Sequence, residues 1–237
     1  SALAKDGRGL AAYIAESLPS SAGQIVLPDG YLQAAHAAAR AGGAVVIADE
    51  VQIGFGRVGS HLWAFETQDA TPDIITMGKP IGNGHPMAAV VTTEEIAESF
   101  ANGMEYFNTF GGNPVSCAVG LKVLEIIARD GLLCNAAIIG ADLLARMRAL
   151  MGKHGVIGDV RGLGLMLGMD LVEDRRTKEP ATERAGRVVE RCRELGVLMG
   201  TDGPYDNVIK LRPPLIFSKA NADHLMQVLE QAFADTE

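Results

Sequence analysis

Short apolar runs alternate with longer segments of helical period along the first half of the chain. The run "LAAYIAES" is followed by "DGYLQAAHAAARAGG", which has an acidic start, alanine-rich filling and two glycines at its end, and the run "AVVIAD" comes directly afterwards. This order is typical of strand–helix–strand units around a mostly parallel sheet. The sequence therefore predicts an α/β protein.

A second region follows two expected helices, "VSCAVGLKVLEIIARDGLL" and "AAIIGADLLARMRALMGKHG". The glycine-rich segment "IGDVRGLGLMLGMDLV" alternates in polarity, which indicates strands of a second sheet. The rest predicts a helix at "ERAGRVVERCRELG", strands at "VLMG" and "NVIKLRPPLIF", and a last helix with Ser218 as its N-cap. We expect one domain over residues 1–140 and a small C-terminal α/β domain over 141–237.

Charge and cysteine usage limit the function classes. The 237 residues carry a net charge of −8 without a dense Lys/Arg cluster, which argues against nucleic acid or an acidic membrane surface as a partner. Cys117, Cys134 and Cys192 lack metal-ligand spacing, as do the five histidines, so we expect buried free thiols and no metal site. No apolar run reaches the length of a membrane span, and the start of the chain lacks a signal-peptide layout. These features predict a soluble, cytoplasmic protein.

Charged residues end three of the expected strands. In an open parallel sheet ligands bind at the carboxyl ends of the strands, where Glu16, Asp49 and Lys79 are expected. Each has an ordinary structural explanation by itself, as a turn cap or a solvated side chain. Lys79, however, precedes the glycine loop "PIGNGHP", where a planar ligand has access to the backbone. A lysine there can form a Schiff base with an aldehyde cofactor, and a neighbouring carboxylate can keep a pyridine nitrogen protonated.

Five motifs carry a family resemblance. "IADEVQIGFGRVG", "PDIITMGKPIGNGHP" and "YFNTFGGNPVSCAVGL", in this order and spacing, resemble the central motifs of the class-III aminotransferases, which are fold-type-I pyridoxal-phosphate enzymes. "GDVRGLGLMLGMDL" and "VIKLRPPL" resemble the C-terminal domain of that family. Members are roughly twice this length, beyond the size of one ordinary domain. The resemblance implies the C-terminal half of such an enzyme: part of the large cofactor-binding domain, followed by the small domain.

The resemblance also implies roles for individual residues. Lys79 would form the Schiff base with pyridoxal 5'-phosphate and later move the substrate proton, while Asp49 would pair with the pyridinium nitrogen. Val51 would pack against one face of the cofactor ring, and Gln52 would lie near its phenolic oxygen. Thr109, in "NTFGGNP", resembles the threonine that reaches the cofactor phosphate of the neighbouring subunit. We therefore expect a homodimer with shared active sites.

Three further charged residues have weaker assignments. Glu50, the second acid of the pair that ends "VVIADE", is interpreted as a structural residue, and Arg57 as its partner. Glu16 lies in a neighbourhood that often contacts substrate in the family.

The substrate residues depart from the common family pattern. Many members have an arginine three residues before the paired prolines, where its planar fork binds an α-carboxylate. Here that position is Lys210, and Arg212 adjoins the prolines. Together with "GTDGP" and "SSAGQI", this resembles the branch of the ethanolamine-phosphate phospho-lyases and, more distantly, the alanine–glyoxylate aminotransferases.

Three functions stay open from the sequence. The first is a lyase that acts on phosphorylated amines such as phosphoethanolamine, and Lys210 and "GTDGP" favour it. The second is a conventional transaminase that moves an amino group to a 2-oxo acid. The third is a shortened C-terminal module without catalytic competence.

Overall fold

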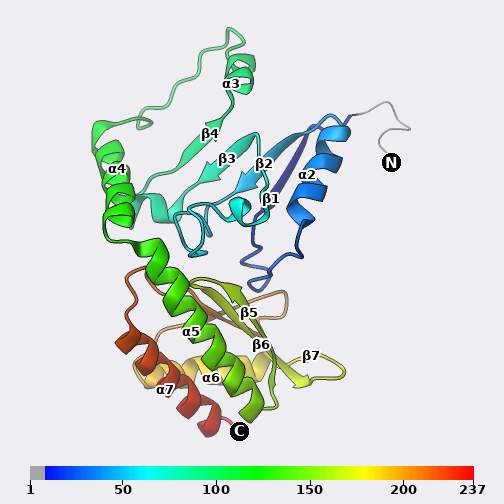
Figure 1. Ribbon diagram of the computed structural model, residues 1–237, viewed down its shortest axis with the longest axis vertical. Coiled ribbons are helices and arrows are strands. Elements are labelled where there is room, and N and C mark those ends of the chain that lie inside the picture. The colour runs from blue at the N-terminus through cyan, green and yellow to red at the C-terminus, as the bar shows by residue number, and fades with distance from the viewer. Residues whose placement is uncertain (1–8) are drawn as a thin grey trace. The chain divides into compact units, whose positions relative to one another are not determined.

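The chain forms two compact units in a computed structural model that describes residues 9–237 (Figure 1). Each unit is assembled from three separate segments of the chain. The first unit comprises residues 9–17, 27–55 and 63–130, and the second comprises residues 18–26, 56–62 and 131–237. The domain boundary expected after residue 140 falls inside helix α5 (Leu132–Lys153), all of which belongs to the second unit.

The first unit holds a mixed four-stranded sheet in the order β1-β2-β3-β4. Strands β1 (Ala12–Glu16), β2 (Val45–Asp49) and β3 (Ile74–Met77) are parallel, whereas β4 (Ala89–Thr92) runs antiparallel to β3. A loop with one short 3₁₀ segment joins β3 to β4. This short connection is sufficient because the two strands are antiparallel, whereas two parallel strands require a longer crossover, usually a helix. The predicted α/β class is confirmed, with one antiparallel strand at the edge of the parallel part.

Helix α2 (Tyr31–Ala41) forms the crossover between β1 and β2 and lies beside them (Figure 1). Its side chains Leu32 and Ala39 belong to two small apolar cores, which also contain Ala48 and Val46 of β2. Buried alanines on both elements allow close packing of helix and strand. The other helical segments of this unit are η1 (Ala64–Gln68), η2 (Lys79–Gly82), α3 (Glu94–Phe100) and α4 (Pro114–Arg129).

The second unit contains an antiparallel sheet in the order β5-β6-β9-β8, with β7 paired to β6. The strand predicted at "VLMG" starts only at its last residue, Gly200, because the pairing with β9 begins there, opposite Lys210. The strands of this unit are β5 (Ile157–Leu163), β6 (Met166–Asp174), β7 (Glu179–Pro180), β8 (Gly200–Asp202) and β9 (Val208–Leu211).

Three helices, α5, α6 (Thr182–Glu194) and α7 (Lys219–Asp235), share one apolar core with this sheet. Leu143 on α5, Phe233 on α7 and Met169 on β6 are fully buried in it. Burial of a side chain of this size stabilises the fold by about 1.5–3 kcal/mol. The core therefore accounts for the association of the helices with the sheet.

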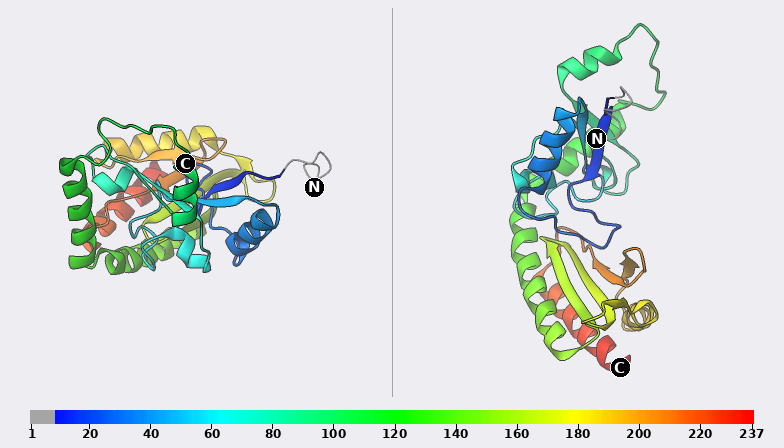
Figure 2. Two further views of the ribbon diagram at one scale, coloured as in Figure 1. Left: turned by 90° about the horizontal axis from the view of Figure 1, so that it is seen from above. Right: turned by 90° about the vertical axis from the view of Figure 1, so that its right-hand side faces the viewer.

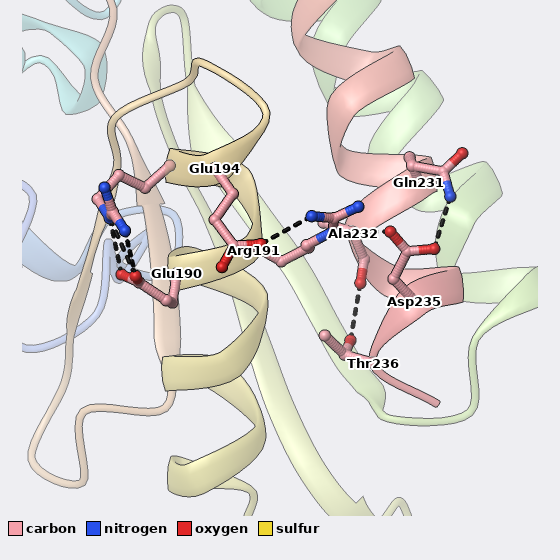
Figure 3. A network of polar contacts seen from close by, with 8 residues as sticks. Glu190, Arg191, Glu194, Gln231, Ala232, Asp235 and Thr236 are labelled. Carbon is pink, nitrogen blue, oxygen red and sulfur yellow. Dashed lines mark hydrogen bonds and ion pairs between the residues drawn. The ribbon is translucent and has the colours of Figure 1, made fainter.

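Polar contacts between α6 and α7 lie outside that core (Figure 3). Arg191 on α6 donates from Nε to Asp235 on α7 at 2.7 Å, and from Nη1 to Glu194 at 2.7 Å. Gln231 donates to the second oxygen of Asp235 at 2.6 Å. Exposed ion pairs of this kind contribute about 0–1 kcal/mol each to the free energy of folding. They therefore add little to the stability of the α6–α7 packing.

The predicted N-cap at Ser218 is confirmed, whereas the predicted burial of all three cysteines is not. Ser218 is the N-cap of α7, as predicted, and its side chain accepts a hydrogen bond from the Asn221 backbone N–H at 3.2 Å. The expectation of three buried thiols is wrong, because Cys117 and Cys134 lie on exposed sides of α4 and α5. Only Cys192 is buried, and burial raises the pKa of its thiol to about 11.

Within residues 9–237, every helix falls short of the length or the apolar character that a membrane span requires.

Candidate functional site

Three charged residues meet at one edge of the first sheet. The parallel register pairs Glu16 at the end of β1 with Asp49 at the end of β2, and Asp49 in turn with Thr76 of β3. Lys79 follows β3 directly as the first residue of η2. Because β1, β2 and β3 are parallel, all three charges lie at the carboxyl edge of the sheet, where α/β proteins bind ligands.

The Asp49 carboxylate is oriented by the turn that follows β2. Its Oδ1 accepts a hydrogen bond from the Val51 backbone N–H at 3.0 Å, a turn that aspartate forms readily. Its Oδ2 has no hydrogen-bond partner among the residues that the structure describes. The half-buried carboxylate therefore has one oxygen fixed by the backbone and one available to a ligand.

Val51 packs against the backbone that leads to Lys79. A Cβ atom placed on the buried Gly78 would lie 3.3 Å from Val51 Cγ1, which is closer than ordinary contact. Glycine at position 78 thus allows the tips of β2 and β3 to approach each other. The structure brings Asp49, Val51 and Lys79 together in this way, and Gln52 follows them in the same turn, half-buried.

The Lys79 side chain is exposed, and its backbone lies in the left-handed region with φ of 36°. Residues with a Cβ adopt this conformation rarely, and such strain is concentrated at functional sites. The loop after Lys79 is tied to α4 by a contact of 2.8 Å between His85 Nε2 and Ser116 Oγ. His85 therefore has a packing role in this loop.

Glu50 is a structural residue, as predicted. It is fully buried, and its Oε1 accepts hydrogen bonds from Ser17 Oγ at 2.6 Å and from the Phe65 N–H at 3.1 Å. Its Oε2 accepts from the Ala64 N–H at 2.8 Å. Burial raises the pKa of Glu50, and these three hydrogen bonds act in the opposite direction. The carboxylate connects the end of β1 and the start of η1 to β2.

Arg57 does not have the partner that the sequence suggested. Its Nη1 donates to the carbonyl oxygens of Leu165 at 3.0 Å and Pro213 at 2.8 Å, so the predicted pairing with Glu50 is wrong. The carboxylate oxygens of Glu50 accept instead from Ser17, Ala64 and Phe65. Burial, and then the charge of Arg212, lower the pKa of Arg57 to about 10.

Lys210 and Arg212 line a cavity of about 490 Å³ in the second unit. Lys210 Nζ lies 2.8 Å from Asp202 Oδ1, and Arg212 Nη2 lies 3.5 Å from Asp202 Oδ2. Gln24 donates from Nε2 to the same Oδ2 at 2.8 Å. Asp202 lies in "GTDGP" and Gln24 in "SSAGQI", but the sequence predicted no role for either residue. The pairing of β8 with β9, which positions Asp202, is a feature of the tertiary structure.

Thr109 lies in an exposed segment of the first unit, between α3 and α4. Phe107 and Phe110 on either side of it are 77% and 80% exposed. Within residues 9–237, no hydrogen bond joins Thr109 to Asp49 or Lys79. In the described part of one chain, Thr109 is therefore not joined by a hydrogen bond to either of these proposed cofactor residues.

The residues at the sheet edge fit the cofactor that the resemblance implies. Pyridoxal phosphate requires an amine for its aldehyde, a carboxylate for its ring nitrogen and an apolar surface for its ring. Lys79, Asp49 and Val51 supply these three groups from adjacent strand ends. The free Oδ2 of Asp49 has the acceptor chemistry that a pyridinium N–H requires.

Comparisons with known proteins give a consistent result. The chain matches the family model of the class-III aminotransferases over residues 2–233. It is 54% identical to an alanine–glyoxylate aminotransferase 2-like protein of Drosophila melanogaster, over 93% of this chain and 45% of the relative. It is 46% identical to the mitochondrial alanine–glyoxylate aminotransferase 2 homolog 2 of Arabidopsis thaliana, over 95% of this chain and 47% of the relative.

A solved structure is also similar to this chain. A phospholyase from Arthrobacter, determined in complex with phosphoethanolamine, superposes with a TM-score of 0.94 at 42% identity, over 98% of this chain and 55% of that one. The chain thus spans about half the length of the proteins that it matches. The family match over nearly all of its residues shows that the chain belongs to the class-III aminotransferases.

Proposed function

We propose that this chain supplies the lysine and the carboxylate that hold the cofactor of an enzyme acting on a primary amine. Pyridoxal 5'-phosphate is the cofactor that membership of the family indicates. When bound, it withdraws electrons from the carbon that carries the substrate nitrogen. The observation that carries the proposal is the position of Asp49 and Lys79 at adjacent ends of β2 and β3, with Val51 against Gly78.

Each residue at this edge has a separate role in the proposal. The Lys79 amine holds the cofactor and, once the substrate amine has displaced it, takes the proton from the carbon that carries nitrogen. Asp49 accepts the pyridinium N–H through Oδ2. Val51 covers one face of the ring, and Gln52 lies near its phenolic oxygen. Glu16, at the same edge, contacts the substrate.

We favour a lyase reaction on phosphorylated amines such as phosphoethanolamine. Lys79 takes the proton, and phosphate leaves from the adjacent carbon with the bonding electrons. A proton then returns to that adjacent carbon, and water releases ammonia and an aldehyde. Lys210 and Arg212, which line a cavity of the second unit, are also proposed as substrate-binding residues. The solved phospholyase in complex with phosphoethanolamine, at 42% identity, supports this choice.

A transaminase is the second candidate, and the names of the Drosophila and Arabidopsis relatives favour it. In that reaction the same lysine would return the proton to a carbon of the cofactor instead of the substrate. A 2-oxo acid then accepts the amino group. The two reactions are distinguished by the products from phosphoethanolamine and from alanine. Release of phosphate without a 2-oxo acid identifies the lyase, and transfer that requires the 2-oxo acid identifies the transaminase.

The third candidate is a module that lacks catalytic competence by itself. The chain spans about half of the length of these relatives. A chain of this kind would fail to hold pyridoxal phosphate at Lys79, so cofactor binding separates it from the first two candidates.

We also propose a homodimer in which Thr109 reaches the cofactor phosphate of the other subunit. Apolar side chains gather in and around its segment and are largely exposed, which is typical of an interaction surface. They are Phe100, Met104, Tyr106, Phe107 and Phe110. Sedimentation equilibrium tests the dimer, and Phe107→Asp should shift it to a monomer. An unshifted dimer would place the interface elsewhere.

A cytoplasmic location is the last part of the proposal and rests on the composition of the sequence. The Arabidopsis relative is named mitochondrial, so cell fractionation distinguishes the two compartments.

Covalent trapping tests the cofactor site directly. Sodium borohydride fixes pyridoxal phosphate to the lysine that holds it, and mass spectrometry identifies the modified peptide. We expect the label on Lys79 in the unaltered chain and its loss in Lys79→Ala. Lys122→Ala, which removes an exposed lysine on α4, is the matched control and should keep the label. A label on another lysine, or none, contradicts the assignment.

A further inference from the structure

Helix α4 is packed closely against the loop that begins at Lys79. A Cβ atom added to the buried Gly120 of α4 would lie 2.8 Å from Met87 Sδ and 3.8 Å from the Ile81 carbonyl oxygen. The first distance is shorter than ordinary van der Waals contact, so glycine at position 120 allows helix and loop to approach each other. The start of α4 therefore has a fixed place beside this loop.

A polar link joins the same loop to the first turn of α4. His85 Nε2 lies 2.8 Å from Ser116 Oγ, and Asn113 Nδ2 donates to that oxygen at 3.0 Å. The Ser116 N–H donates in turn to Asn113 Oδ1 at 2.9 Å, as in a helix N-cap. A hydroxyl has one donor and two acceptor positions, so it can bind both neighbours whichever ring nitrogen of His85 carries the proton. All three residues are half-buried.

Asn113 also holds the turn that contains Thr109. Its Nδ2 donates to the Phe110 carbonyl oxygen at 2.7 Å. Within the turn, Asn108 Oδ1 accepts from the N–H groups of Phe110 at 3.1 Å and of Gly111 at 2.9 Å, a turn that asparagine forms readily. Thr109 lies between the residues that form these hydrogen bonds, so the course of its backbone follows from them.

Burial contributes little to the order of this segment. Residues 101–112 are all exposed, and a loop with few buried contacts opens at a low cost in free energy. In the part of the chain that the structure describes, the hydrogen bonds to Asn113 are the main connection between the turn and α4. Through Ser116, His85 ties that connection to the loop of Lys79.

We propose that His85 is a positioning residue for Thr109. Through Ser116 and Asn113 it orders the turn with which Thr109 reaches the cofactor phosphate of the other subunit. The Lys79 loop of each subunit then helps to complete the site of its partner. This inference rests on the proposed homodimer and on the proposed cofactor site.

Hydrogen exchange measured by mass spectrometry tests the ordering in the chain without cofactor. His85→Ala should speed amide exchange in peptides that contain Thr109 by about 3- to 10-fold, the effect of one lost hydrogen bond. His85→Gln should restore most of the protection, because its side-chain amide can also bind a hydroxyl. His61→Ala is the matched control, since His61 is exposed and its Nδ1 lies 2.9 Å from Ser60 Oγ. Unchanged exchange in His85→Ala would overturn the inference.

Hybrid dimers test whether His85 acts on the site of the other subunit. In the first hybrid one subunit carries Lys79→Ala and the other His85→Ala, so the remaining Lys79 receives Thr109 from a subunit with native His85. In the second hybrid one subunit carries both substitutions and the other is unaltered, so the remaining Lys79 receives Thr109 from the altered subunit. Borohydride trapping at increasing concentrations of pyridoxal phosphate gives the Kd at that lysine. We expect Kd to be about threefold higher, or more, in the second hybrid than in the first.

The opposite order would contradict the inference, because His85 would then act on the lysine of its own subunit, and an equal Kd in the two hybrids would contradict it as well. A reference hybrid of Lys79→Ala with an unaltered subunit distinguishes these failures from failure of the proposed function. Absence of a label on its remaining Lys79 would remove the cofactor site, and a chain that stays monomeric would remove the dimer. Either result would remove the present inference too.

Discussion

The Asp49 carboxylate accepts a hydrogen bond from the Val51 backbone N–H at 3.0 Å. One short turn thus orients both the residue proposed to hold the pyridinium and the residue proposed to cover the ring. A Cβ atom added to Gly78 would also lie against the Val51 side chain. The same turn therefore influences how closely the ends of β2 and β3 approach each other. Substitutions in this turn separate the chemical role of Asp49 from its structural role.

Asp49→Asn should preserve the fold and weaken the cofactor site. The asparagine oxygen can still accept from Val51, but the amide offers no negative charge to a pyridinium. Loss of one preorganised charge costs on the order of 10²-fold in proton removal. Stopped-flow absorbance of the cofactor-loaded protein measures that rate. Asp69→Asn, at an exposed residue with φ of 47°, makes the same charge change and should leave the rate unaltered. An equal rate in Asp49→Asn contradicts the pyridinium role.

Gly78→Ala should push Val51 away from its present position. The added Cβ would lie 3.3 Å from Val51 Cγ1, and overpacking of this kind costs about 1–3 kcal/mol. We expect a lower free energy of unfolding in urea and a weaker affinity for pyridoxal phosphate by absorbance titration. Gly186→Ala on α6 meets no atom within 4 Å and should be neutral or stabilising. Unchanged cofactor affinity in Gly78→Ala would show that Val51 does not contact the ring.

Glu50→Gln should destabilise the first unit. Oε1 accepts from the Phe65 N–H and Oε2 from the Ala64 N–H, so in either orientation the new NH₂ group faces a backbone donor. A buried donor without an acceptor costs about 1–3 kcal/mol. Urea unfolding measures this loss, and Glu98→Gln, an exposed glutamate on α3, is the control. Equal stability of the two variants would mean that the Glu50 hydrogen bonds are not maintained in solution.

His36 should make stability depend on pH. It is buried on α2, and its Nδ1 lacks a hydrogen-bond partner among residues 9–237. Burial, followed by the charge of Arg40, lowers its pKa, while Asp73 opposes the shift. The unfolded chain, with a histidine pKa of about 6.5, then binds more protons than the folded one. The contribution is complete above about pH 6.5 and is lost as pH falls below that value.

The measurement is urea unfolding between pH 7.5 and 5. His36→Gln should flatten the decrease in the free energy of unfolding, whereas His61→Gln, at an exposed histidine, should not. The same slope in both variants would assign the pH dependence to other groups.

Local patterns in the sequence predicted much of the fold. The strands that end at Glu16 and Asp49, the strand before Lys79 and the N-cap at Ser218 follow from periodicity and capping chemistry, which act over a few residues. The direction of β4 did not follow, because an apolar run of strand length carries no signal for parallel or antiparallel pairing. The exposure of Cys117 and Cys134 depends equally on what packs against each helix.

The sequence by itself determined the family, and it indicated Lys79 and Asp49 as the residues proposed to carry its chemistry, because both stand in motifs of fixed order and spacing. Only the tertiary structure decided the partners of the other charged residues. Arg57 binds backbone carbonyls, and Asp202 joins Gln24 to Lys210 across distant parts of the chain. The physical reason is that a buried charged group must form hydrogen bonds with the donors or acceptors that the fold places next to it. Separation along the sequence does not show which groups those are.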